Sequence, residues 1–376
     1  MPDNKALEQL RRQIGRIDDD ILDLLARRAE LARSVVKTKV EHRLPVFVPE
    51  QEAAKTADFR TRAAARGMDP DWAEDFLRII MGASRATQSM QDYPRATRHP
   101  RHILFVGGEG GMGRLYRAAA ERSGHAVSSI DQGNWHELEA LAPKLDLVIV
   151  TVPIKATPAV IARLGGRLEA HTVLADFTSN KSAPLQAMLD AHPGPVVGLH
   201  PMHGADVKNL SKQLMVVCPG RHAGRAAWFV DQCRLWGMRI IETDAEQHDH
   251  AMHLVQGLRH FVALLHGSFM RHHDLKPADM LAYSSPIYRA ELMMTGRIFA
   301  QSAELYADIV FASEQRRRLL LDFFAHHRRL ADLVEQNDRA GFIREFERVT
   351  DFFGRFASQA LSESSYLIHR LADRFA

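Results

Sequence analysis

A histidine at the end of an apolar run is the residue of this sequence most suited to proton transfer. Residues 197–204 read VGLHPMHG, which places His200 directly before Pro201. Because proline cannot donate a hydrogen bond to a sheet, we expect a strand over 196–199 that ends before His200. An imidazole exchanges protons near neutral pH, so His200 is a candidate acid–base group. A loop histidine without a chemical role is the alternative interpretation.

A glycine-rich loop is the second pattern with chemical meaning. It fits G-x-G-x-x-G and contains Gly108, Gly110, Gly111, Met112 and Gly113. A predicted strand over 103–106 precedes the loop and a predicted helix over 114–123 follows it, which is the context of a dinucleotide site. Glycines let the backbone approach a pyrophosphate, and the helix N-terminus offers free N–H groups. A tight turn without a ligand is the alternative.

An acidic residue lies where a dinucleotide site needs one. Asp131 follows the next predicted strand, at 126–130. Its carboxylate can accept hydrogen bonds from the ribose hydroxyls of the adenosine and would repel a 2′-phosphate. We therefore expect NAD rather than NADP as the cofactor.

The elements that position these residues form a predicted α/β sheet. Further strands are expected at 147–152, 172–176, 196–199, 214–218 and 239–241, and helical segments separate most of them. In a doubly wound sheet, ligands bind beyond the carboxyl ends of the strands. Val152 and Pro153 lie at the end of one strand. Lys181 and His200 follow two others, so we expect all four at one rim of the sheet.

Helical patterns precede and follow the predicted strands in the sequence. In residues 4–41, apolar residues recur at steps of three and four. At ~1.5 Å per residue, such a helix is too long for a small domain to bury alone, so we expect it to pack along a second copy of the chain. The predicted domains are a helical domain at 1–92, a linker at 93–101, a Rossmann-type domain at 102–243 and a helical domain at 244–376.

Composition excludes several classes of partner. The chain has 376 residues, 46% of them hydrophobic, and a formal charge of +3. This small charge predicts neither nucleic acid nor a membrane surface as a partner, and no apolar run approaches the ~18 residues of a membrane span. Its two cysteines are too few for a disulfide framework, which favours the reducing cytoplasm. The arginine triplet at 316–318 is expected to lie on a solvated helix face.

The combination and order of four segments resemble a known family. These segments are LRRQIGRIDDDILDLLARRAELA, VGGEGGMGRL, GLHPMHG and SSPIYRAEL followed by GRIFAQ. Together they resemble the bifunctional chorismate mutase/prephenate dehydrogenases of tyrosine biosynthesis. The resemblance implies an all-α mutase domain, a Rossmann domain and an all-α dimerisation domain in a homodimer. It also implies two substrates, chorismate and prephenate, with NAD+ as the oxidant of the second.

The resemblance also implies the residues of a mutase site. It assigns catalytic roles to Arg28, Lys39 and Gln88, and substrate contacts to Arg11, Glu52 and Ser84. Arg28 and Lys39 are about three helical turns apart and share a face, whereas Arg11 is expected to reach the site of the partner chain. Gln51 departs from the family, which typically has arginine there, and this departure predicts a weaker mutase.

In the dehydrogenase half, the resemblance assigns prephenate binding to Arg297, and pocket positions to Lys181 and His260. His200 would take the proton of the substrate hydroxyl, and the chemistry calls for no metal. One alternative is an arogenate or other small-acid dehydrogenase with a weak or purely dimerising mutase-like domain. Another is a non-enzymatic module that senses dinucleotides. The sequence leaves open whether tyrosine is an effector.

Overall fold

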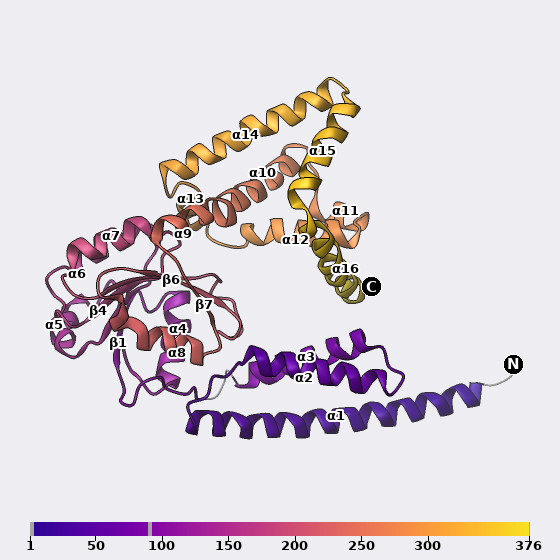
Figure 1. Ribbon diagram of the computed structural model, residues 1–376, viewed down its shortest axis with the longest axis horizontal. Coiled ribbons are helices and arrows are strands. Elements are labelled where there is room, and N and C mark those ends of the chain that lie inside the picture. The colour runs from indigo at the N-terminus through magenta and orange to yellow at the C-terminus, as the bar shows by residue number, and fades with distance from the viewer. Residues whose placement is uncertain (1–3, 89–91, 376) are drawn as a thin grey trace. The chain divides into compact units, whose positions relative to one another are not determined.

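The computed structural model describes residues 4–88 and 92–375, apart from the side chains of residues 4, 86–88 and 372–375. The chain divides into two compact units, Met1–His248 and Asp249–Ala376. The first unit contains both the N-terminal helices and the sheet (Figure 1). Each unit is described separately below.

The N-terminal part of the first unit is helical. Its helices are α1 (Asn4–Glu41), α2 (Pro49–Ala64) and α3 (Pro70–Gln88). Proline occupies the first turn of α2, where a missing N–H costs nothing. α3 contacts both α1 and α2 (Figure 1). The predicted helix over 4–41 is thereby confirmed.

One face of α1 is apolar but exposed. The side chains concerned are 40–63% exposed and lie between residues 7 and 24 of the helix: Leu7, Leu10, Ile14, Ile17, Ile21 and Leu24. Apolar residues at this spacing normally pack against another element. The exposed stripe is the surface that the sequence predicts a second copy to cover.

The sheet of the first unit has seven strands in the order β2-β1-β3-β4-β5-β6-β7. The strands are β1 (His102–Val106), β2 (Ala126–Ile130), β3 (Leu147–Val150), β4 (Val173–Asp176), β5 (Val196–Pro201), β6 (Leu214–Pro219) and β7 (Arg239–Glu242). β1 to β5 pair in parallel, and β6 pairs antiparallel with β5. The predicted doubly wound sheet is confirmed, with this one reversal.

Helices cover both faces of the sheet. They are α4 (Gly111–Arg122), α5 (Leu138–Leu141), α6 (Thr157–Leu164), α7 (Ser182–Ala191) and α8 (Ala227–Leu235). Alternate residues of the strands point to opposite faces: Ile103 and Phe105 pack with Tyr116 of α4, whereas Leu104 and Val106 pack on the other side. The resulting two hydrophobic cores hold the strand ends in fixed positions.

The end of β5 differs from the expectation that proline stops it at Leu199. β5 continues through His200 and Pro201, which pair with β6. Its pairing with β4 ends at Gly198, and Met202 N donates to Leu214 O of β6. By alternation, the nitrogen of Pro201 points to the side that β4 no longer occupies. No ladder hydrogen bond is therefore lost, as on an edge strand.

The predicted linker packs against the sheet domain. Tyr93 is buried, and the Arg122 guanidinium lies 4.6 Å from the centre of its ring. Gln232 of α8 accepts a hydrogen bond from Ala96 N at 2.9 Å and donates one to Pro94 O at 2.9 Å. Residues 93–96 are thus fixed on the sheet domain.

The second unit is helical. After α9 (Ala245–Met252), which crosses the boundary between the units, and a π-helix (His253–Leu258), it contains α10 (Arg259–His272), α11 (Pro277–Ala282), α12 (Pro286–Phe299), α13 (Ala303–Val310), α14 (Glu314–Glu335), α15 (Arg339–Phe353) and α16 (Arg355–Phe375). Among the described residues, no helix is long and apolar enough to cross a membrane.

One arginine of the second unit contradicts the sequence analysis. Arg316 is only 1% exposed and donates to Ile309 O, at the end of α13, whereas Arg317 and Arg318 are exposed. Gly257 of the π-helix leaves room for its side chain, because a Cβ there would lie 2.7 Å from Arg316 Cδ. The prediction of a solvated triplet is therefore wrong for its first member.

Candidate active sites

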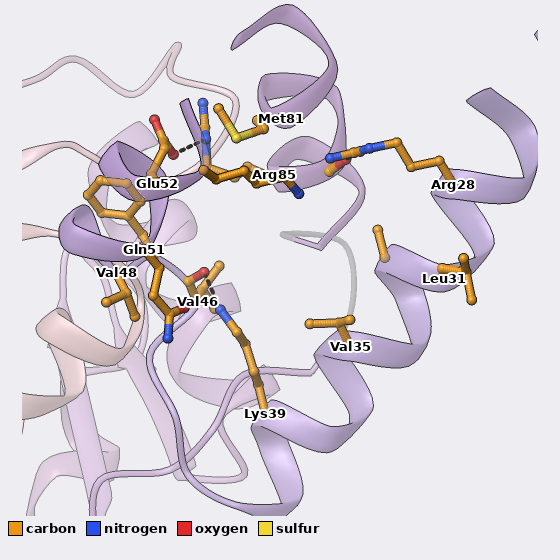
Figure 2. Close-up of a pocket in the computed structure, with 14 residues that line it drawn as sticks. Arg28, Leu31, Val35, Lys39, Val46, Val48, Gln51, Glu52, Met81 and Arg85 are labelled. Atoms are coloured by element: carbon orange, nitrogen blue, oxygen red, sulfur yellow. Dashed lines mark hydrogen bonds and ion pairs between the residues drawn. The ribbon is translucent and has the colours of Figure 1, made fainter. Parts of the chain in front are cut away.

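A pocket of about 300 Å³ lies between α1, α2 and α3. Figure 2 shows Arg28, Lys39, Gln51, Glu52 and Arg85 at this pocket, among apolar side chains. The residues from α1 recur every three or four positions, so they share one helix face. The pocket therefore combines an apolar wall with several cations.

The structure brings several predicted mutase residues together in this pocket. Arg28 Nη1 donates to Ser84 Oγ at 2.6 Å, which joins α1 to α3. Lys39 Nζ donates to Val46 O at 2.9 Å, and burial lowers the pKa of Lys39. Two cations from one helix face thus line a single pocket, which suits an anionic ligand.

Glu52 lies among cations that the sequence analysis did not identify. Its Oε2 accepts from Arg85 Nη1 at 2.6 Å. Its Oε1 is paired with Lys212, on the loop before β6, and lies 3.8 Å from Arg78 Nη1. Arg85 directly follows the predicted residue Ser84, and this position could have pointed to it, but no sequence signal links Lys212 to this pocket.

The two remaining predicted mutase residues are not seen at the pocket. The side chain of Gln88 lies outside the described part of the chain. Arg11 is exposed on α1, and at ~1.5 Å per residue it lies about 25 Å along the helix from Arg28. An arginine at that distance is too far to complete the pocket of its own chain.

The glycine-rich loop between β1 and α4 leaves no room for side chains. Gly107 has a φ of +88°, and a Cβ there would lie 2.7 Å from Val152 Cγ1. A Cβ on Gly108 would lie 2.9 Å from Arg117 Cδ, and one on Gly113 would lie 2.6 Å from Gly107 O. The loop backbone can therefore approach a ligand closely, as a pyrophosphate site requires. Gly107, which precedes the predicted motif, belongs to this loop as well.

Helix α4 starts inside the predicted motif. Its N-cap residue is Gly110, which has no side chain to cap the first N–H groups of the helix. A Cβ on Gly111 would lie 2.8 Å from Ala205 Cβ, and Met112 packs against the core beside it. The loop after His200 therefore lies next to the start of α4.

The acidic residue of the predicted cofactor site is held at the end of β2. Asp131 Oδ2 accepts from Ser129 Oγ at 2.9 Å, and Asp131 N donates to Asn134 Oδ1 at 2.8 Å. Val152 and Pro153 follow β3 and are half-buried and exposed, respectively. With the open N-terminus of α4, these residues fit a dinucleotide whose ribose hydroxyls meet a carboxylate.

His200 is paired with a second histidine. Its Nδ1 lies 2.8 Å from Nε2 of His248 on α9, and both residues are 2% exposed. This contact uses Nδ1 of His200 within the protein. The sequence analysis did not identify His248, because its pairing with His200 depends on the fold.

Lys181 supports the strand that carries His200. The side chain is fully buried, and its Nζ is paired with Asp176 and donates to Leu199 O at 2.8 Å. That carbonyl lies just past the end of β4, where no strand can satisfy it. The structure thus places Lys181 beneath the rim, as a support for the end of β5.

His203 links the same loop to α4. Tyr116 Oη and His203 Nε2 are 3.0 Å apart, and burial lowers the pKa of His203. Together with the contact of Gly111 and Ala205, this bond ties the His200 loop to the cofactor loop. A proton acceptor and a dinucleotide loop are thus adjacent within one unit.

The second unit carries the other predicted prephenate residues. Arg297 is exposed on α12. His260 on α10 packs against Tyr306, with 4.8 Å between ring centroids, and burial followed by the nearby Arg259 and Arg316 lowers its pKa to about 4. At neutral pH His260 is therefore uncharged, so it can donate or accept a hydrogen bond but adds no positive charge.

Three family models match the chain in sequence order. Residues 10–89 match the chorismate mutase type II family, and residues 117–237 match the nucleotide-binding domain of prephenate dehydrogenase. Residues 244–348 match the prephenate dehydrogenase dimerization domain. Among solved structures, the prephenate dehydrogenase from A. aeolicus, in complex with hydroxyphenyl propionate and NAD+, has a TM-score of 0.56 at 17% identity. It covers 68% of this chain and 97% of its own, and at this identity it supports the fold alone.

Two curated relatives match over almost the whole chain. The T-protein of Enterobacter agglomerans is 41% identical, and that of Haemophilus influenzae is 39% identical. Each match covers 98% of this chain and 98% of the relative. The chain therefore belongs to the T-protein family, the bifunctional enzymes of tyrosine biosynthesis that convert chorismate to prephenate and then oxidise prephenate with NAD+.

Proposed function

We propose that the pocket between α1, α2 and α3 is the chorismate mutase site. The observation that carries this proposal is the placement of Arg28, Ser84 and Lys39 in one pocket. Chorismate is a dianion that rearranges without a covalent intermediate, so the site needs cations for its carboxylates and donors for the breaking ether bond. In this account Arg28 binds a carboxylate, and Lys39 and Gln88 donate to the ether oxygen.

The dehydrogenase site, in the same account, is the rim where His200 meets the glycine-rich loop. Bound NAD+ supplies the hydride acceptor. His200 Nε2 accepts the proton of the ring hydroxyl of prephenate while the carbon loses hydride. In this account Nδ1–H of His200 donates to His248, which fixes the tautomer in which Nε2 is the proton acceptor. Oxidation makes the ring carboxylate that of a vinylogous β-keto acid, so CO2 leaves readily.

Substrate preference tests this assignment. We expect NAD+ reduction to be faster with prephenate than with arogenate, because the chain matches T-proteins over almost its whole length and matches the prephenate dehydrogenase domains. The measurement compares kcat/KM for the two substrates on the same preparation. A clear preference for arogenate would instead support the alternative of an arogenate dehydrogenase.

Arg297 provides a test of prephenate binding. Replacing Arg297 with glutamine removes a charge-assisted contact to a carboxylate. We expect KM for prephenate to rise at least about tenfold, which corresponds to about 1.4 kcal/mol, with little change in KM for NAD+. If the affinity for NAD+ falls instead, Arg297 belongs to a different site.

We further propose a homodimer that works in the cytoplasm. The exposed apolar stripe of α1 and the match to a dimerization domain support the dimer. Both cysteines are buried free thiols, as expected in a reducing compartment. A tyrosine effector stays a prediction from the family resemblance alone.

A further inference from the structure

The mutase pocket contains a guanidinium that neither the family pattern nor the sequence analysis assigns. Gln51 leaves the pocket without the arginine expected at that position, yet Arg85 of α3 lines the same pocket. We propose that Arg85 binds a carboxylate of chorismate and supplies the positive charge that Gln51 lacks. This inference rests on the proposed mutase site.

Arg85 is held in place at the pocket wall. Its side chain is 18% exposed, and its Nη1 donates to Glu52 Oε2 at 2.6 Å. Figure 2 shows this pair at one side of the pocket, with Arg28 extending from α1 on the other side. A guanidinium fixed by one contact loses little further entropy on binding a ligand. It also has five N–H donors, so a bond to Glu52 leaves others for a carboxylate.

The charges around Glu52 keep this side of the pocket positive. While Arg85 takes Oε2, Lys212 is paired with Oε1 and Arg78 lies 3.8 Å from it. Arg78 is itself paired with Glu74 at 2.5 Å, but the single carboxylate of Glu52 cannot neutralise both Arg85 and Lys212. Glu52 therefore orients Arg85 without cancelling its attraction for an anion, and the partial burial of the pair strengthens that attraction.

Lys212 adds support from outside the mutase helices. Its φ of +67° is uncommon for a side-chain-bearing residue, and its backbone N donates to Gly237 O at 2.8 Å. Its ammonium also lies 4.8 Å from the ring centre of Phe47, which lines the pocket. The sheet domain thus holds Glu52, and through it Arg85, in position.

Lys55 is the competing candidate for the missing charge. It lies one turn after Gln51 on α2 and lines the same pocket, but it is exposed. A long exposed lysine loses more conformational entropy on binding than a guanidinium already held by a carboxylate. Lys55 therefore becomes one arm of the test.

The experiment measures mutase kinetics on the full chain for a matched set of variants. Arg85→Met should raise KM for chorismate at least about tenfold. Arg85→Lys should retain part of the affinity because the charge remains. Arg62→Met is the matched control, because Arg62 pairs with Asp58 on α2 and does not line the pocket. The KM of this variant for chorismate should stay within about twofold of the wild-type value. Oxidation of prephenate by NAD+ should be unchanged in every variant.

Introducing an arginine at position 51, with and without Arg85, provides the most direct test. Gln51→Arg alone should change kcat/KM less than about threefold, because Arg85 already supplies the cation. In the Arg85→Met background the same change should recover most of the loss. A merely structural role for Arg85 predicts no such recovery and a lower unfolding temperature.

The proposal is overturned if Arg85→Met raises KM for chorismate no more than Arg62→Met does. It is also overturned if Gln51→Arg does not restore the affinity lost in Arg85→Met, or if Lys55→Met raises KM while Arg85→Met does not. A gain of about fivefold or more from Gln51→Arg in the wild type would also contradict it, since the site would then lack this cation. Absence of mutase turnover in the wild-type chain would instead refute the proposed mutase site.

Discussion

Replacing His200 with asparagine is expected to lower kcat for prephenate oxidation by ~10²-fold or more, with little change in KM for prephenate. Asparagine keeps a polar side chain in the buried position beside His248 but cannot accept the proton of the substrate hydroxyl. Because that proton moves in the transition state, the loss should appear in kcat. Steady-state NADH formation with saturating NAD+ measures it.

His222→Asn is the matched control for this prediction. His222 is an exposed loop residue of the same domain with a φ of +50°, a conformation that asparagine tolerates well. We expect its dehydrogenase kinetics to be unchanged. Mutase activity should be unchanged in both variants. A His200→Asn chain that oxidises prephenate at nearly the wild-type rate would remove His200 from the mechanism.

Mixing two inactive mutase variants should restore activity. Arg11→Ala and Arg28→Ala should each lower mutase kcat/KM by ~10²-fold or more, because each removes a cation from the substrate dianion. In a heterodimer of the two, one site combines an intact Arg28 with an intact Arg11 from the other chain. Random exchange should then recover about a quarter of the wild-type activity, since half of the dimers are mixed and each has one intact site.

Subunit exchange must be shown independently in this experiment, for example with two differently tagged chains. Each variant alone provides the baseline. If exchange is complete and activity does not rise above that baseline, each mutase site is built from one chain. That result would contradict the proposed role of Arg11 in the site of the partner chain.

Local patterns predict much of this fold. The apolar spacing in α1 and the short apolar runs of the strands are local features of the sequence. They are therefore enough to predict these helices and strands. The end of β5 was predicted wrongly because Pro201 is tolerated only where β4 has already ended. Arg316 was predicted wrongly for a similar reason, since its burial depends on Gly257 and on the end of α13.

In the candidate sites, too, residues within motifs were predicted, whereas contacts that depend on the fold were not. Motifs and resemblance identified Arg28, Ser84 and His200, which the structure places in pockets or at the sheet rim. Two partners were missed because they come from distant segments: Lys212, which pairs with Glu52, and His248, which pairs with His200. Glu52 and Lys212 are 160 residues apart, and His200 and His248 are 48 apart. Contacts over such separations depend on how complete domains pack, which no short pattern encodes.

A coupled assay from chorismate tests the central claim that one chain carries both activities. The purified chain is given chorismate first without and then with NAD+. The account predicts loss of chorismate and accumulation of prephenate without NAD+, followed by NADH and 4-hydroxyphenylpyruvate once NAD+ is present. If chorismate persists while added prephenate still yields NADH, the helical domain is not a mutase and the bifunctional account is contradicted.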